Sequence, residues 1–232
     1  MLRVLLSVGV IFLFSGCFSG SDDSEKSTDN TEETTDSSEN CSSSTTPNLI
    51  VPFYGSDIDN INIDNVFVSA DYADMENTPN QKSHVGWHYS PTEDYINSND
   101  SISYKAMADG CITRVQLDSP DSNANTSVLV EFSSNISMVY IFEPNPTTDY
   151  LSSTQQSQLD LIKVSEGDKI SQGDPIGELF FPEETIYSPK LHVHINEGED
   201  TNCLSSYMSE EGLSTTEDIL EEDNPDWQLC YE

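Results

Sequence analysis

Apolar and polar side chains alternate along much of the chain beyond residue 48, and this alternation predicts short β-strands. Successive side chains of a strand point to opposite faces, so a period of two is typical of strands that bury one face. The segments with this period are 66–68, 111–117, 127–132, 137–142 and 191–195. Turn-forming sequences with Gly, Pro, Asn or Asp separate them, at 109–110, 119–121, 145–146, 166–168 and 173–175. Many short strands joined by turns indicate a mostly β sandwich or barrel.

Helical signals are sparse and fall in two places. Residues 152–161 predict a helix of one or two turns. Ser214 and Glu217 have the spacing of a capping box, which favours a short C-terminal helix over 214–222. The expected fold class is therefore mostly β with a short C-terminal helix.

The N-terminus has the features of an export signal. Arg3 precedes the apolar run Val4–Phe14, which is shorter than the ~20 residues that span a bilayer and is typical of a signal-peptide core. The run ends at Phe14-Ser15-Gly16-Cys17, which resembles the lipobox of bacterial lipoproteins, with Phe14 in place of the usual Leu. We expect a signal peptide over 1–16 and a lipid on Cys17 that anchors the protein to a membrane of the cell envelope, on its periplasmic or extracellular side.

A polar segment separates this signal from the rest of the chain. Residues 18–47 are almost entirely Ser, Thr, Asp, Glu, Asn and Gly. They offer little apolar surface to offset the chain entropy lost on folding, so we expect 17–47 to be a disordered tether that carries the lipidated cysteine at its start. The remainder, 48–232, is long enough for one domain with its own core.

Charge and cysteine content narrow the partners and the compartment. The chain has 42 acidic and 8 basic residues, a formal net charge of −34. This argues against nucleic acid as a partner, because phosphate binding relies on clustered Lys and Arg. Besides Cys17 there are four cysteines, Cys41, Cys111, Cys203 and Cys230. Outside the cytoplasm an even count favours disulfides, and of the three possible pairings we favour one between Cys203 and Cys230.

Four segments form a pattern in chain order, namely His84-Val85-Gly86-Trp87-His88, 106–112 (AMADGCI), 164–177 (VSEGDKISQGDPIG) and 191–198 (LHVHINEG). Together they resemble the sequence pattern of the lysostaphin-type (LytM-like) zinc endopeptidases of bacterial cell walls. The resemblance implies a domain of the duplicated-hybrid-motif kind, a zinc cofactor, and action on the peptide cross-links of peptidoglycan. The IIA enzyme of sugar phosphotransferase systems shares this fold type and the Gly-Asp turns, but the expected export argues against it.

The four histidines indicate a metal site independently of the resemblance. They form two close pairs, His84 with His88 and His192 with His194. Spacings of four and two residues place both members of a pair on one face of a strand, so adjacent strands would bring the imidazoles together. Imidazole is a good ligand for zinc and for later first-row metals. The alternative is a set of solvated histidines without a metal.

The resemblance assigns roles to these residues. In the family, a His, an Asp four residues later and the second His of a His-x-His motif hold the zinc, and water takes the fourth position. Here His84 is the first ligand and His88 replaces the Asp. Aligned without a gap, His192 is the third ligand, Lys190 replaces an assisting histidine and His194 takes a Glu position. A shift of two residues would make His192 the assisting residue and His194 the ligand. We prefer the ungapped register, in which His194 or Lys190 polarises substrate or water.

Departures from the family leave two functions open. A second assisting histidine, in a Tyr-x-His motif, is expected at Phe142 and is therefore also replaced. General acid–base help of this kind is worth about 10²–10⁴-fold in rate. The first function is a zinc endopeptidase of the cell envelope, and the second is a degenerate module that binds cell wall or activates a cell-wall amidase. Four protein ligands, including His194, or a groove filled by 145–158 would favour the second, because catalysis needs an open coordination position.

Overall fold

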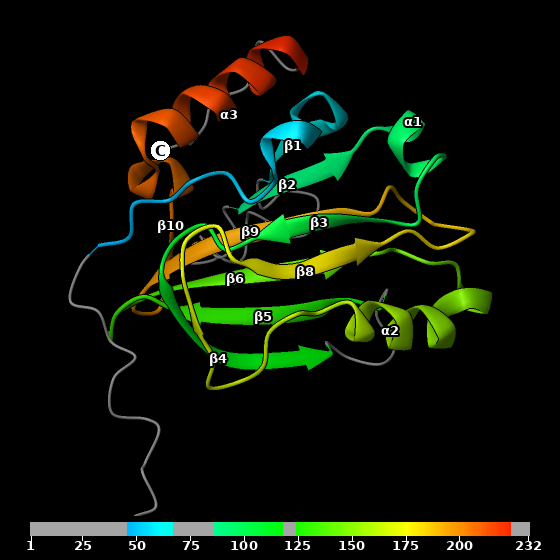
Figure 1. Cartoon of the computed structure of the whole chain (residues 1–232), viewed down its shortest axis with the longest axis horizontal. Helices are drawn as coiled ribbons and strands as arrows, with labels where there is room; N and C mark the ends of the chain where they lie inside the picture. The colour runs from blue at the N-terminus through cyan, green and yellow to red at the C-terminus, as the bar shows by residue number, and fades with distance from the viewer. Residues whose placement is uncertain (1–45, 67–85, 118–123, 224–232) are drawn as a thin grey trace, which may run out of the picture. The chain divides into compact units, whose positions relative to one another are not determined.

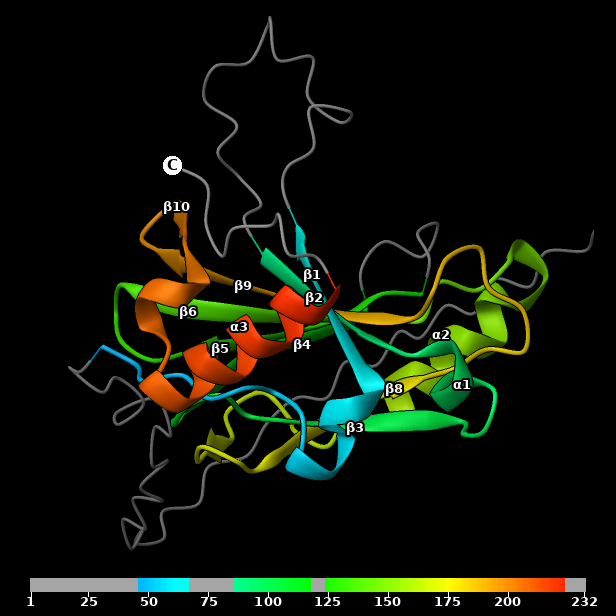
Figure 2. The same cartoon turned by 90° about the horizontal axis from the view of Figure 1, so that it is seen from above.

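Two β-sheets packed face to face form the body of the computed structural model, which describes residues 46–66, 86–117 and 124–223. All of these residues belong to one compact unit, Asp36–Glu232. A small two-stranded sheet lies in front of a large one in Figure 1, and Figure 2 shows the same two layers from above. No helix within these ranges is long and apolar enough to cross a membrane.

The large sheet is antiparallel and brings strands from distant parts of the chain together. Its strand order is β1-β2-β9-β6-β5-β4-β7, and β10 pairs with β9 off this path. The strands are β1 Ile61–Val66, β2 Gly86–Pro91, β4 Gly110–Leu117, β5 Thr126–Glu131, β6 Ile136–Glu143, β7 Lys169–Ile170, β9 Lys190–Glu197 and β10 Asp200–Asn202. The small sheet pairs β3 Ser101–Lys105 with β8 Pro175–Phe180. The strand β9 therefore lies between β2 and β6, although β2 and β9 are about a hundred residues apart in sequence.

The apolar core fills the space between the two sheets. Alternate residues of the central strands are fully buried there, namely Trp87, Tyr89, Met138, Tyr140, Phe142, Leu191, Val193 and Ile195. From the small sheet, Tyr104 packs against Phe142 with ring centroids 6.2 Å apart and donates a hydrogen bond of 3.0 Å to the Tyr89 carbonyl oxygen. Because side chains alternate along a strand, the remaining residues of β2, β6 and β9 lie on the face of the large sheet that is turned away from this core.

Helices lie beside the strands of both sheets. The helix α2, Leu151–Asp160, lies along β8, where the buried Gln158 side chain donates to the Glu178 carbonyl and accepts from the Phe180 amide. The helix α3, Glu210–Asp223, lies against β1 (Figure 1). Shorter elements are α1 Glu93–Ile96, η1 Gly55–Asn60, η2 Thr148–Tyr150 and η3 Leu204–Tyr207.

Two similar turns flank β7 and set the path into β8. Gly167 and Gly173 have φ angles of 94° and 91°, in the left-handed region that glycine adopts without steric cost. In each turn the following aspartate, Asp168 or Asp174, accepts a 2.8 Å hydrogen bond from the backbone amide of a serine three residues earlier. Both turns lie where the Gly-Asp sequences predict them.

The expected fold class, mostly β with a short C-terminal helix, is confirmed. The strands predicted over 111–117, 127–132, 137–142 and 191–195 correspond to β4, β5, β6 and β9, and the helix predicted over 152–161 corresponds to α2. The pairing of β3 with β8 was not predicted. The start predicted for the C-terminal helix is wrong: α3 begins at Glu210, and its cap is Ser209, whose hydroxyl accepts from the Gly212 amide at 3.0 Å. Ser214 lies inside the helix.

Several expectations concern residues outside the described ranges. The signal peptide, the lipidation of Cys17, the tether, and Phe67 and Val68 of the predicted strand 66–68 all lie there. The presence of disulfides is confirmed, since Cys111 and Cys203 are both disulfide-bonded. Cys41 and Cys230 are not among the described residues, so the pairing of Cys203 with Cys230 stays a prediction.

Candidate metal centre

Three adjacent strands bring His88, His192 and Glu143 together. His88 of β2 is the cross-strand partner of His192 of β9. On the other side of β9, Lys190 is the partner of Glu143 of β6. Cross-strand partners share a face of the sheet, so all of these side chains lie on the face turned away from the core. The site therefore depends on the pairing of β9 with both of its neighbours.

The three side chains lie close enough together to hold one metal ion. One potential ligand atom from each residue lies within 4.8 Å of those from the other two. The His192 Nδ1 atom is 3.4 Å from Glu143 Oε1, which is longer than the 2.7–2.9 Å of a charge-assisted hydrogen bond. Two donors bound to one zinc ion sit about 3–3.5 Å apart by tetrahedral geometry. The His88 and His192 rings are perpendicular, with centroids 4.9 Å apart.

Gly86 provides the space in which the His192 ring lies. A Cβ atom placed on Gly86 would overlap His192 Nε2, and it would lie 2.7 Å from His192 Cδ2 and 2.5 Å from the Val193 carbonyl oxygen. Real Cβ atoms essentially never come so close to other atoms. The glycine between the two histidines of the 84–88 motif is therefore required by the close approach of β9, and this approach fixes the ring of His192 against β2.

Burial and nearby positive charge favour the neutral form of His88, and the two other side chains of the group are also largely buried. His192 is only 6% exposed, and the Glu143 side chain is 14% exposed. Burial lowers the pKa of His88 from 6.5 to about 2, and the nearby His192 and Lys190 act in the same direction. His88 is thus neutral over the physiological pH range, and neutral imidazole is the form that coordinates metals. The Glu143 carboxylate also lies 3.8 Å from the Lys190 ammonium group.

The structure places the other predicted site residues as follows. Lys190 lies on the same strand face as His192 and pairs with Glu143. His194 lies next along this face, 9% exposed, with its ring centroid 5.3 Å from that of His192. Among the described residues, His194 does not belong to the group of converging ligand atoms, which is His88, Glu143 and His192. The choice between the two registers, with His192 or His194 as the ligand, stays a prediction. His84 lies outside the described residues, and its role stays a prediction.

Sequence reasoning missed Glu143 and misplaced Phe142. Phe142 is fully buried in the core, on the opposite face of β6 from the histidines. The expectation that it stands at the position of an assisting histidine is therefore wrong. On the histidine side, β6 presents Ile141 opposite His192 and Glu143 opposite Lys190. The alternation of Met138, Tyr140 and Phe142 with intervening residues was the signal that could have placed Glu143 in the site.

Residues 145–158 do not fill the space over the histidines. This stretch contains η2 and much of α2, which lies along β8 of the small sheet. Its first residue, Asn145, holds the segment before β9 instead, because its side-chain amide donates to the Ser188 carbonyl at 3.0 Å and to the Glu143 carbonyl at 3.2 Å. These two hydrogen bonds link the end of β6, which carries Glu143, to the segment just before Lys190, the first residue of β9.

The donor set fits zinc. Two imidazole nitrogens and one carboxylate oxygen are ligands that catalytic zinc sites use, with the remaining position left for water. The neutral state of His88, the 3.4 Å spacing at His192 and Glu143, and the cradle at Gly86 all agree with an ion held between β2, β9 and β6. With His84 as a further ligand the coordination would be complete without water, which is the structural type of zinc site.

No protein-family model matches the chain, and no curated protein matches it. Among solved structures, the SpoIIQ–SpoIIIAH pore-forming complex is similar with a TM-score of 0.44 and 18% identity, over 74% of this chain and 96% of that chain. The catalytic domain of the prophage-encoded M23 protein EnpA from Enterococcus faecalis gives 0.37 and 14%, over 66% and 92%. Lysostaphin gives 0.35 and 15%, over 50% of this chain and 38% of that chain. All three TM-scores are below 0.5, so conclusions about function rest on the residues of this chain.

Proposed function

We propose that this chain is a divergent LytM-like, zinc-dependent hydrolase that acts on the peptide cross-links of peptidoglycan. The observation that carries the proposal is the convergence of His88, His192 and Glu143 on one face of three adjacent strands. It agrees with the four sequence segments that resemble this family, and His192 occupies the ligand position of that pattern. Bound zinc would act as a Lewis acid and lower the pKa of a coordinated water.

The residues around the proposed ion have distinct roles. His88 and His192 would hold the metal together with the predicted ligand His84. Glu143, whose carboxylate is 3.4 Å from His192 Nδ1, is placed to accept a proton from water at the site and takes the place of the missing assisting histidine. Lys190 forms an ion pair with Glu143 and would offer a positive charge to a polarised carbonyl. His194 extends the same face of β9 beyond His192.

A second function is favoured by the burial of the site. His192 and His194 are nearly inaccessible, and Glu143 is largely so. If Glu143 is itself a ligand beside His84, His88 and His192, four protein groups surround the ion and no position remains for water. The domain would then be a zinc-stabilised module that binds cell wall or activates a cell-wall amidase.

One experiment separates the two functions. The zinc-loaded chain and its Glu143→Gln variant are incubated with purified peptidoglycan, with and without a chelator, and released peptides are measured by mass spectrometry. A hydrolase gives chelator-sensitive cleavage, and Glu143→Gln lowers its rate about 10²–10⁴-fold while zinc affinity is retained. Absence of cleavage by a chain that binds zinc, with zinc affinity lowered by Glu143→Gln, would reject the hydrolase and support the binding module.

We further propose that the domain works at the envelope, held by lipid at Cys17 through the tether 17–47. Both features come from the sequence alone.

A further inference from the structure

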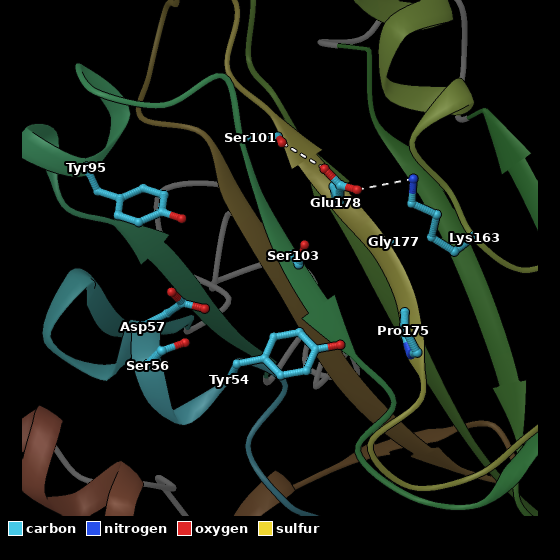
Figure 3. A pocket seen from close by; sticks show the side chains of 10 residues that line it. All are labelled: Tyr54, Ser56, Asp57, Tyr95, Ser101, Ser103, Lys163, Pro175, Gly177 and Glu178. Atoms are coloured by element: carbon cyan, nitrogen blue, oxygen red, sulfur yellow. Dashed lines mark hydrogen bonds and ion pairs between the residues drawn. The ribbon is translucent and has the colours of Figure 1, made fainter.

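A hollow of about 740 Å³ opens on the outer face of the small sheet, on the opposite side of the sandwich from the histidines. Its floor is the side of β3 and β8 turned away from the core and includes Ser101, Ser103 and Glu178. Across from them lie η1, with Ser56 and Asp57, and the two tyrosines Tyr54 and Tyr95 (Figure 3). The volume is in the range of sites for small organic ligands, about 300–1,000 Å³.

The polar groups of the hollow are held in place. Glu178 accepts a 2.8 Å hydrogen bond from the Ser101 hydroxyl and is 3.1 Å from the Lys163 ammonium group. The Tyr54 ring is oriented by the Lys105 ammonium group, 5.5 Å from the ring centroid. The carboxylate of Asp57 and the hydroxyl of Tyr95 face the same space (Figure 3), and the negative charge of Asp57 adds to burial in raising the pKa of Tyr95. A rigid, preorganised lining lowers the cost of binding a ligand.

The composition of this lining excludes several ligand classes. Its one cation, Lys163, is already paired with Glu178, and Asp57 has no cation partner among the described residues. An anionic ligand would therefore meet uncompensated negative charge. A purely apolar ligand would leave the Asp57 carboxylate desolvated and without a cation partner among the described residues, which is costly. A simple ammonium ion would use Asp57 but would make no use of the Ser103 hydroxyl on the floor of the hollow.

A neutral saccharide uses all of these groups at once. Each sugar hydroxyl both donates and accepts a hydrogen bond, as do the hydroxyls of the serines and tyrosines that line the hollow. Carboxylates accept strongly from such hydroxyls. The less polar C–H face of a sugar ring packs against an aromatic face, and the hollow has two tyrosine rings on the side opposite its serine floor. We propose that this hollow binds a neutral saccharide, with Tyr54 and Tyr95 against the sugar rings and Asp57, Glu178 and Ser103 bonded to its hydroxyls.

This site is independent of the proposed zinc centre, because the two lie on the outer faces of different sheets. Its test uses the full chain and an uncharged probe, the β-1,4-linked trimer of N-acetylglucosamine, titrated while backbone amide NMR shifts are recorded in a chelator. We expect saturable shifts at β3, β8 and η1. Asp57→Ala should weaken binding about tenfold, since it removes hydrogen bonds to a charged group. Ser103→Phe, which places a ring on the floor, should abolish it.

The controls make each outcome decisive. Glu131→Ala removes an exposed carboxylate of β5 outside the hollow, and it should bind the trimer like the wild type. Far-ultraviolet circular dichroism checks that every variant is folded. The proposal is overturned if no shifts occur, if Ser103→Phe binds normally, or if Glu131→Ala weakens binding as much as Asp57→Ala. It is also overturned if 1,5-diaminopentane shifts the same amides and the trimer does not, because the hollow would then be a cation site. Loss of binding in His192→Ala would place the saccharide at the metal centre instead.

Discussion

The close approach of β9 to Gly86 makes a sharp prediction for the substitution Gly86→Ala. The added methyl group would overlap the His192 imidazole and would lie 2.5 Å from the Val193 carbonyl oxygen. The imidazole can rotate, but the carbonyl belongs to the backbone of the neighbouring strand and cannot move without separating β2 from β9. Overpacking of this kind costs about 1–3 kcal/mol, and the lower entropy of the unfolded alanine chain offsets only about 0.4–1 kcal/mol of that.

We therefore expect Gly86→Ala to lower the free energy of unfolding by about 1–2 kcal/mol. For a domain of this size, that corresponds to a melting temperature lower by about 2–8 °C. The measurement is urea unfolding of the wild type and variant in a chelator, followed by zinc titration of each folded protein. Zinc affinity should also fall, because the displaced His192 ring no longer matches the positions of His88 and Glu143.

A matched control is available at Gly55. A Cβ atom there meets nothing within 4 Å, and the residue has no left-handed φ. Gly55→Ala should therefore leave the stability within about 0.5 kcal/mol of the wild type and leave zinc binding unchanged. If Gly86→Ala behaved like Gly55→Ala in both measurements, the tight packing of His192 against β2 would be refuted.

Three further predictions concern pH, the role of Lys190 and the membrane anchor. The folded protein holds His88 neutral, with a pKa of about 2, whereas the unfolded chain binds a proton below about pH 6.5; stability from this residue is thus lost as pH falls from about 6.5 toward 2. The free energy of unfolding is measured in urea, in a chelator, at pH 7.5 and at pH 5, for the wild type and for His88→Gln. The decrease between these pH values should be about 2 kcal/mol smaller in the variant. Equal decreases in the two proteins would contradict the low pKa of His88. If the domain is a hydrolase, Lys190→Met should lower peptidoglycan cleavage more than it lowers zinc affinity, and an unchanged rate would remove Lys190 from the mechanism. Cys17→Ala should release the protein from membranes on fractionation, and a variant that stayed with the membrane would argue against lipid attachment.

The local pattern of the sequence predicted most of the large sheet, because alternation shows directly which residues of a strand face a core. Met138, Tyr140 and Phe142 alternate with less buried residues, and so do Leu191, Val193 and Ile195. The small sheet was harder to predict, since β3 is short and β8 begins at a proline and contains Gly177. Gly177 is needed where β8 packs closely against β6, because a Cβ atom on it would lie 2.9 Å from the Phe142 ring. Glycine and proline are not typical of strands, so the sequence pattern did not indicate β8.

Alternation along a strand also predicted part of the candidate site. The spacing of His192 and His194 shows that they share a face, but it does not show which strand lies on either side. Glu143 reaches His192 only because β6 pairs with β9 in the observed register, and this pairing joins residues some fifty positions apart. Long-range register is a property of the whole sheet, so a pattern read within one strand cannot supply it.

The central claim is that His88, His192 and Glu143 belong to one zinc site, and calorimetric titration of the metal-free full chain with zinc tests it most directly. We predict one tightly bound ion per chain, with binding weakened at least a hundredfold by His192→Ala and unaffected by Glu131→Gln, which changes an exposed residue at the end of β5. Zinc binding that was absent from the wild type, or that was equally strong in His192→Ala, would contradict the claim.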